Sequence, residues 1–217
     1  VGHCDEEIIN YLKKSNSINR ENVITIPEDI ITCSGQTKNM IKEELDINQA
    51  KFVIGHRACI HYKDRLYNGL LVANDILGGG PNSKLFKNVR EKESLAYYIN
   101  SSVFKYKSLL LVDGGIEFEN LDRTIDIVRD ELDAIKNGDF SKNDIDISVK
   151  SLKSSTESIK DSIFLISEFF FSQSISQDFR TLEEIMLDFE EVTKEEIVEA
   201  ANKITIDTIY FMRNKTE

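Results

Sequence analysis

Two strand-like runs stand next to each other in the chain, and they constrain the fold more than any other feature. Residues 94–106 (SLAYYINSSVFKY) and 108–118 (SLLLVDGGIEF) are rich in Leu, Ile, Val, Tyr and Phe. They meet at residues 105–108, and apolar runs joined by such a short connection are typical of a β-hairpin. We therefore predict an antiparallel pair of strands near the middle of the chain.

Three further segments have strand patterns. Residues 20–26 (RENVITI) stop at a proline, and residues 207–212 (DTIYFM) lie close to the C-terminus. Residues 50–62 carry apolar side chains at alternate positions, which predicts a longer strand. Gly55 within that strand predicts a bulge or the close approach of another backbone.

Helical patterns fill most of the remaining chain. The signals are apolar periodicity, acidic first turns, glycine stops and capping residues. For the short helix at 82–93 the expected cap is Asn82 or Ser83, and Thr193 with Glu196 is expected to form a capping box. The predicted helices lie at residues 4–14, 67–80, 82–93, 120–138, 181–189 and 193–203.

The longest helical signal covers residues 141–176. Apolar residues recur there at alternating steps of four and three, from Ile145 to Phe170. A coiled coil has the same repeat, but its flanking positions carry paired charges, and that charge pattern is missing here. We therefore expect one long helix that covers a sheet, with a coiled coil as the alternative.

Strands and helices are grouped along the chain rather than alternating. A doubly wound sheet needs regular strand–helix–strand units, which this order lacks. We therefore predict an α+β fold in which helices pack on one face of a largely antiparallel sheet, as a single domain over residues 1–217. The chain starts abruptly at Val1 rather than at Met, so we expect it to be a fragment of a longer chain.

Charge and cysteine content bear on partners and location. The net charge is −11, whereas a general nucleic-acid binder or a peripheral membrane protein usually needs a basic face, so we expect neither partner. Cys4, Cys33 and Cys59 are too few and too widely spaced for a disulfide framework. Free thiols and a cytoplasmic location are predicted, since no signal peptide and no apolar stretch of about 18 residues is found.

The glycine-rich loop at residues 78–80 has two possible roles. Backbone N–H groups ahead of a helix can bind phosphate, but a P-loop needs G-x-x-x-x-G-K-[ST] after a strand, and this loop follows a helix without that motif. A tight connection between two helices is therefore predicted for Gly78, Gly79 and Gly80. In particular, a side chain at Gly79 or Gly80 is expected to block close approach of the backbone.

The sequence offers no set of residues for a catalytic metal. Its histidines are His3, His56 and His61, and the last two are expected on opposite faces of one strand. The segment after His3 begins an H-x-x-E pattern but has Glu7 where a second histidine would be needed. No three-ligand zinc site can be assembled by spacing. A Ser–His–Asp triad stays open because such triads have no fixed spacing, although no G-x-S-x-G supports one.

The segment LGGGPNSKLFKNVREKESLAYYINS resembles a motif of the pitrilysin/insulinase family of zinc metallopeptidases, which includes the mitochondrial processing peptidases. The second homologous half of these proteins typically carries L-G-G-x-x-S-x-L-[FY]-x-x-[VL]-R-[ED]-x-x-[GS]-L-[AT]-Y. The present chain has one extra residue in the glycine loop. It also resembles the family more weakly at VGHCDEEIINYLKK, QAKFVIGHR and ANKITIDTIYFM. The matching residues are Leu77, Gly78, Gly79, Ser83, Leu85, Phe86, Val89, Arg90, Glu91, Leu95, Ala96 and Tyr97.

This resemblance implies a fold and a mode of action. Family members have two similar α+β halves, of the LuxS/processing-peptidase type, that close around a peptide substrate, and the first half carries zinc in an H-x-x-E-H motif. The present chain lacks that motif, so it resembles the C-terminal, non-zinc half and is expected to be inactive alone. Zinc is then expected in a homologous half or a partner subunit.

In the family the Arg and Tyr of the motif contact the substrate near the zinc, which implies a substrate-binding role for Arg90 and Tyr97. A guanidinium and a phenol can both donate hydrogen bonds to a peptide carbonyl or to an oxyanion. The alternatives from the residues alone are an ion pair of Arg90 with a nearby acid such as Glu93, and a packing role for Tyr97 at the edge of the core. Tyr98 is expected on the opposite side of the strand from Tyr97, as a packing residue.

Three functions are therefore compared. The first is a substrate-holding half of a peptidase, which the presence of both Arg90 and Tyr97 favours. The second is a scaffold member of the same family without peptidase activity, which would need neither residue. The third is an unrelated binder of a small ligand.

Overall fold

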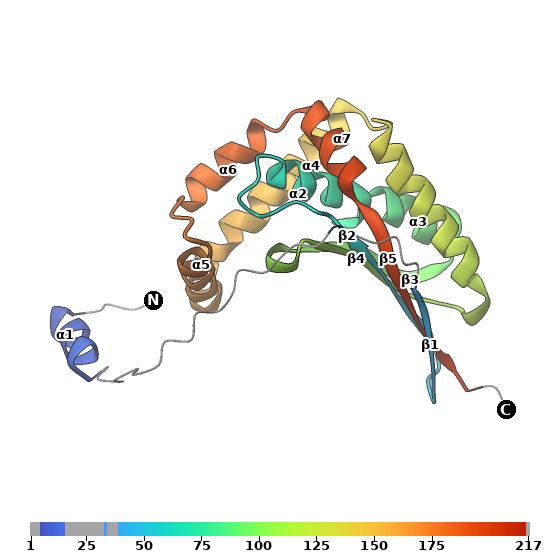
Figure 1. The fold of residues 1–217 in the computed structure, drawn as a ribbon, viewed down its shortest axis with the longest axis horizontal. Coiled ribbons are helices and arrows are strands. Elements are labelled where there is room, and N and C mark those ends of the chain that lie inside the picture. Colours follow the sequence, from blue (N-terminus) through green and yellow to red (C-terminus); the bar gives the residue numbers. More distant parts are fainter. Residues whose placement is uncertain (1–4, 16–32, 34–38, 216–217) are drawn as a thin grey trace.

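The computed structural model describes residues 5–15, 33 and 39–215, and its centre is one five-stranded sheet (Figure 1). The strand order is β1-β5-β2-β4-β3. β1 pairs in parallel with β5, and the other three neighbouring pairs are antiparallel, including the β3–β4 hairpin predicted from the sequence. The strands are β1 (Asn39–Leu45), β2 (Ala50–Arg57), β3 (Ala96–Phe104), β4 (Leu109–Ile116) and β5 (Thr205–Asn214).

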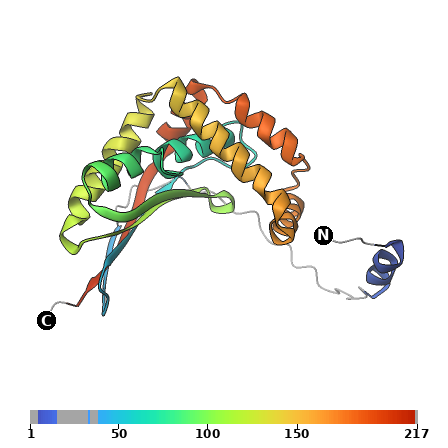
Figure 2. The same ribbon diagram turned by 180° about the vertical axis from the view of Figure 1, so that it is seen from behind.

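Helices cover one face of this sheet and leave the other face open (Figures 1 and 2). α2 packs on β3 and also contacts α3, α4 and α7, while α4 and α6 pack on each other farther from the sheet. These observations confirm the α+β fold with a largely antiparallel sheet. The helices are α1 (Glu6–Ser15), α2 (Tyr67–Gly78), a π-helix (Phe86–Lys92), α3 (Leu121–Lys136), α4 (Lys142–Glu157), α5 (Ile163–Ser176), α6 (Leu182–Glu190) and α7 (Lys194–Lys203).

The core lies between the sheet and the helices that cover it. Alternate residues of β2, namely Phe52 and Ile54, and of β4, namely Leu110 and Val112, are buried and face the helices. The helix predicted at 120–138 is α3, whose buried apolar residues join the same core, and Gly138 follows this helix with a φ of +76°. Burying such side chains contributes about 1.5–3 kcal/mol each, which fixes the sheet against the helix layer.

Capping residues set several helix starts. The predicted capping box of Thr193 and Glu196 is confirmed at α7. The same reciprocal arrangement occurs at α6 with Thr181 and Glu184. Each box satisfies two backbone donors that the first turn leaves without intrahelical partners.

The helix expected over residues 141–176 is interrupted. α4 ends at Glu157, a short 3-10 turn covers Ser158–Asp161, and the Ser162 side chain accepts a hydrogen bond from the Leu165 N–H to start α5. The prediction that one helix from 145 to 170 covers the sheet is therefore wrong. The local capping chemistry of Ser162 outweighed the apolar repeat.

The strand expected over residues 50–62 ends at Arg57 instead. The chain turns there because Ser108 binds both sides of Cys59, which has a left-handed φ of 54°. The Ser108 carbonyl accepts from Ala58 N at 2.8 Å, and the Ser108 hydroxyl bonds Ile60 N at 2.9 Å and Ile60 O at 2.8 Å. The bulge predicted at Gly55 is confirmed, since the register of β2 against β5 shifts between Gly55 and His56.

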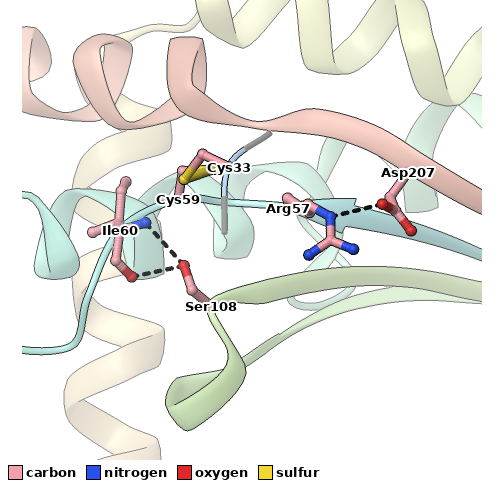
Figure 3. Close-up of a disulfide and its surroundings, with 6 residues drawn as sticks. All are labelled: Cys33, Arg57, Cys59, Ile60, Ser108 and Asp207. Carbon is pink, nitrogen blue, oxygen red and sulfur yellow. Dashed lines mark hydrogen bonds and ion pairs between the residues drawn. A yellow bond between two sulfur atoms is a disulfide. The ribbon is translucent and has the colours of Figure 1, made fainter. Parts of the chain in front are cut away.

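A disulfide joins Cys33 to Cys59 at the end of β2 (Figure 3). The prediction of free thiols is therefore wrong for these two residues, because folding brings their Cα atoms to 5.7 Å across a separation of 26 residues. Sequence reasoning also missed β1, a strand whose seven residues are all exposed. Cys4 and the predicted strand at 20–26 lie outside the described residues.

Within the described part of the chain, no helix is both long enough and apolar enough to cross a membrane.

Candidate functional site

The glycine loop is a close connection between α2 and the next helix. A Cβ on Gly78 would lie 2.7 Å from the Ser101 backbone nitrogen, and a Cβ on Gly79 would lie 2.6 Å from Asp75 Cα. A Cβ on Gly80 would meet nothing within 4 Å. The prediction that a side chain would block close approach of the backbone is thus confirmed for Gly79 and wrong for Gly80. The other close approach in the loop is at Gly78, which packs against Ser101 of β3.

The carboxylate of Asp75 folds back beside this loop. Burial raises the pKa of Asp75, and hydrogen bonds from Ser148 and Ser151 of α4 oppose that rise. The Ser151 hydroxyl lies 3.2 Å from the carboxylate. Because Gly79 has no side chain, the Asp75 carboxylate has room beside the loop and can accept the hydrogen bond from Ser151. This contact anchors the loop to α4, so the loop has a structural role.

The segment after the loop is a helix that widens into π geometry. Ser83 begins it, as one of the two predicted caps, by accepting a hydrogen bond from the Phe86 N–H at 3.3 Å. At its end the Glu93 N–H donates to the Asn88 carbonyl at 3.2 Å, a step of five residues. Single π turns are rare and frequently occur at functional sites.

Two side chains of α3 hold this π-helix. Glu131 accepts from Asn88 Nδ2 at 2.5 Å and from Lys84 Nζ at 3.3 Å. Arg123 pairs with Glu93 at 3.4 Å. Sequence reasoning did not identify Glu131, since nothing in the spacing of α3 distinguishes it from the other acids of that helix.

Arg90 is exposed on the π-helix. Its guanidinium lies over the ring of Phe86, 4.7 Å from the centroid. The ion pair that was the structural alternative, Arg90 with Glu93, is not formed because Glu93 pairs with Arg123. Among the described residues, no carboxylate lies within ion-pair distance of Arg90. The spacing of Phe86 and Arg90, four residues apart on a helix, is the signal that could have predicted their contact.

Tyr97 lies in a β-bulge at the start of β3. Ala96 pairs with Ile116 and Tyr98 pairs with Gly115, so Tyr97 is the extra residue. Its side chain is 76% exposed. A bulge commonly re-aims a side chain next to a functional site.

The bulge also corrects the expectation for Tyr98. Ala96 and Ile99 are both buried towards the helices although they are three residues apart, so Tyr97 and Tyr98 both leave the strand on the open face. A Cβ on Gly115 would lie 2.8 Å from the Tyr98 ring, which shows that this ring covers Gly115. Gly114 and Gly115, which are adjacent in β4, are the sequence signal that could have predicted this bulge.

Arg90 and Tyr97 are tied together through the backbone. The Leu95 N–H donates to the Val89 carbonyl at 2.9 Å, which joins the π-helix to the start of β3. The structure thus brings the two predicted site residues to one connection, and both are exposed. The glycine loop lies at the other end of the same helix, and its close packing against Ser101 and Asp75 positions that helix.

The histidines do not form a metal centre in the described residues. His56 is buried in β2, where desolvation lowers its pKa to about 4, and its Nδ1 lies 3.3 Å from the Leu110 carbonyl. His61 lies in the turn after the shortened β2, so the prediction of opposite strand faces is wrong. Residues 5–15, 33 and 39–215 contain no group of three His, Cys, Asp or Glu side chains that could hold a metal ion, so these residues do not fit a zinc site.

Comparison with known protein families identifies the chain. Residues 6–152 match the model of the peptidase M16 inactive domain. The chain is 41% identical over 178 residues to the probable inactive metalloprotease YmfF of Bacillus subtilis, and this match covers 82% of the chain and 42% of the relative. It is 28% identical over 112 residues to an uncharacterized zinc protease of the same organism, covering 51% of the chain and 27% of the relative.

Solved structures share the fold. A conserved protein from Enterococcus faecalis superposes with a TM-score of 0.79 and 30% identity, covering 84% of this chain and 43% of that chain. A protease from Helicobacter pylori superposes with a TM-score of 0.78 and 19% identity, covering 97% of this chain and 52% of that one. The chain spans less than half the length of the curated relatives it matches. The chain therefore belongs to the peptidase M16 family, as its inactive domain.

Proposed function

We propose that this chain is the substrate-holding half of an M16-type peptidase and that Arg90 and Tyr97 contact the substrate. Zinc would then be supplied by the homologous half that contains the zinc motif, either in the same protein or in a partner subunit. One observation carries the proposal. The guanidinium of Arg90, which pairs with no carboxylate of the described residues, and the phenol of Tyr97 are both exposed, and a backbone hydrogen bond joins the segments that carry them.

The proposed chemistry uses donors only. The guanidinium of Arg90 carries five N–H donors and a fixed positive charge, and the Tyr97 hydroxyl supplies one further donor. Such groups can hold a substrate carbonyl and stabilise the negative charge that develops on its oxygen. The ring of Phe86 beneath Arg90 restricts where the guanidinium can lie, so less ordering is needed when substrate binds.

The direct experiment is steady-state hydrolysis of fluorogenic peptides by the whole protein, in which this chain is present together with its companion half. Arg90→Ala and Tyr97→Phe are the test variants. Lys92→Ala and Tyr98→Phe are matched controls, since they remove a neighbouring exposed cation and a neighbouring phenol. Loss of turnover in the test variants alone supports the proposal.

A scaffold role is the second candidate, and one observation favours it. The relative with 41% identity is named a probable inactive metalloprotease. A scaffold would need the fold and the interfaces but not the donors of Arg90 and Tyr97. If the whole protein hydrolyses none of the peptides while its two halves stay associated, the scaffold role is the better account.

A further inference from the structure

α5 is rich in large apolar side chains, yet most of it is exposed. Its sequence, IFLISEFFFSQSIS, contains one charged residue, Glu168. Phe164 is 69% exposed and Phe171 is 62% exposed. In a globular protein the apolar face of a helix normally packs against the core. In the described residues no element covers these side chains, so α5 is an unpartnered surface.

The position of α5 is fixed on its polar side. Tyr106, between β3 and β4, donates its hydroxyl to the Ser172 carbonyl at 3.1 Å, and Lys105 lies 3.4 Å from the Ser176 hydroxyl. Gln173 Nε2 donates to the Arg180 carbonyl at 2.5 Å. The helix is therefore held against the body while its apolar side chains point outward.

We define the α5 face as the exposed apolar side chains of this helix. An apolar cavity of about 380 Å³ adjoins it, with Phe169, Phe170 and Phe179 in its wall. A cavity beside projecting aromatic rings is a shape that a complementary protein surface can fill. The α5 face consists of Ile163, Phe164, Leu165, Phe170, Phe171 and Ile175.

α1 carries a second apolar surface that no other element of the described residues covers. It is amphipathic, and Ile8, Ile9 and Tyr11 are exposed. Figures 1 and 2 show α1 separate from the sheet and its helices, beyond the end of the molecule where α5 lies. An amphipathic helix usually gains its stability by packing its apolar side, so α1 also requires a partner.

We infer that the companion half of the peptidase covers the α5 face and the apolar side of α1 together. This inference rests on the proposed function, which requires such a half. The match covers 42% of the Bacillus subtilis relative, and 43% and 52% of the chains in two solved structures. About half or more of each of these proteins therefore lies outside the match. A partner of that size can bridge two helices that do not touch each other.

Charge argues against a membrane as the occupant. Interfacial helices generally carry Lys and Arg on their polar side. The sole charged residue of α5 is acidic, the two lysines of α1 are balanced by Glu6 and Glu7, and the chain carries a net charge of −11. An anionic membrane surface would repel this protein. A protein surface requires no such positive charge.

The experiment measures amide hydrogen exchange in α1 of the whole protein after changes in α5. In the variant Phe164→Glu with Phe171→Glu, exchange of residues 6–15 is expected to become at least tenfold faster, because both helices depend on one partner. The matched control is Met40→Glu, which places the same charge on an exposed apolar residue of β1 and is expected to leave α1 unchanged. The second double variant, Phe164→Ala with Phe171→Ala, is milder because alanine is a good helix former. Faster exchange of α1 in this variant would therefore not be explained by unfolding of α5.

Four results overturn the inference. Unchanged exchange in α1 in both double variants would show that α1 and α5 have separate environments. If sedimentation shows that the wild-type whole protein self-associates and that the double variants are monomeric, a second copy of the protein covers the α5 face. If the wild type binds phosphatidylcholine or phosphatidylglycerol vesicles and the double variants do not, a membrane covers the α5 face. Equal acceleration by Met40→Glu would make the effect non-specific.

The outcome is separable from that of the proposed function. Arg90→Ala and Tyr97→Phe do not alter either apolar surface, so exchange in α1 should stay slow in them. If these variants keep full turnover while the α5 variants expose α1, the substrate role fails and the interface stands. If they lose turnover while α1 is unaffected by changes in α5, the interface fails and the substrate role stands.

Discussion

Leu95 donates its backbone N–H to the carbonyl of Val89 at 2.9 Å, and this bond joins the helix of Arg90 to the strand of Tyr97. Arg90 follows Val89 directly, and Tyr97 lies two residues beyond Leu95. The relative position of the two proposed substrate contacts is therefore set by main-chain geometry. Their side chains are expected to lie within about 10 Å of each other if one peptide is to touch both.

Substitutions in the glycine loop should distinguish Gly78 from Gly80. Gly78→Ala places a methyl group against the Ser101 backbone, so a loss of stability of about 1–3 kcal/mol is expected. Gly80→Ala meets open space and should change stability by less than about 0.5 kcal/mol. Urea unfolding of the two variants checks this difference, and equal losses would contradict it.

Glu131 should stabilise the π-helix more than Arg123 does. Glu131→Ala leaves two partners, Asn88 and Lys84, without their acceptor in a partly buried place, which costs about 1–3 kcal/mol. Arg123→Ala breaks an exposed ion pair with Glu93 and should cost less than about 1 kcal/mol. Chemical denaturation at low and high salt measures both, and the reverse order would rule out the role assigned to Glu131.

Reduction of the disulfide should destabilise the fold. Cys33 and Cys59 are 26 residues apart, and closing a loop of that size lowers the entropy of the unfolded chain, which stabilises the fold by about 3.5 kcal/mol. Thermal unfolding with and without a reducing agent checks this in the wild type. Cys33→Ser serves as the control, since its stability should not respond to the reducing agent.

His56 should make stability depend on pH. Burial lowers its pKa from 6.5 to about 4, so the unfolded chain binds this proton more tightly than the folded one. The contribution is complete above about pH 6.5 and is lost as the pH falls towards 4, with a total of up to about 3 kcal/mol. Urea titrations at pH 5 and pH 7.5 should show a smaller difference for His56→Gln than for the wild type. An equal difference would assign the pH dependence to other groups.

The sequence predicts the parts of the fold that repeat a simple pattern. The apolar stripe of α3, the capping box at Thr193 and the hairpin of β3 and β4 each follow from local spacing. β1 could not be predicted in this way, because its residues are exposed on both sides and show no alternation in burial. The end of β2 depends on Ser108, a residue from a distant hairpin, so it is a tertiary effect.

The family motif proposes Arg90 and Tyr97 as site residues, and their substrate role stays a prediction. Both are exposed in the structure, but the sequence did not predict how they are presented. The Tyr97 bulge, the stacking of Arg90 on Phe86 and the support from Glu131 all depend on three-dimensional packing. These features decide how the donors are presented, and no single segment of sequence encodes them.

The most direct test of the central claim is the turnover of fluorogenic peptides by the whole protein with Tyr97→Phe, beside Tyr98→Phe. The Tyr97 variant keeps the ring and removes one donor, so kcat should fall by a factor of the order of 10²–10³, while the Tyr98 variant should stay close to the wild type. Arg90→Ala should lose more, because it removes a charge together with its hydrogen bonds. Unchanged kcat and KM in both Arg90→Ala and Tyr97→Phe would contradict the account and leave these residues with a structural role.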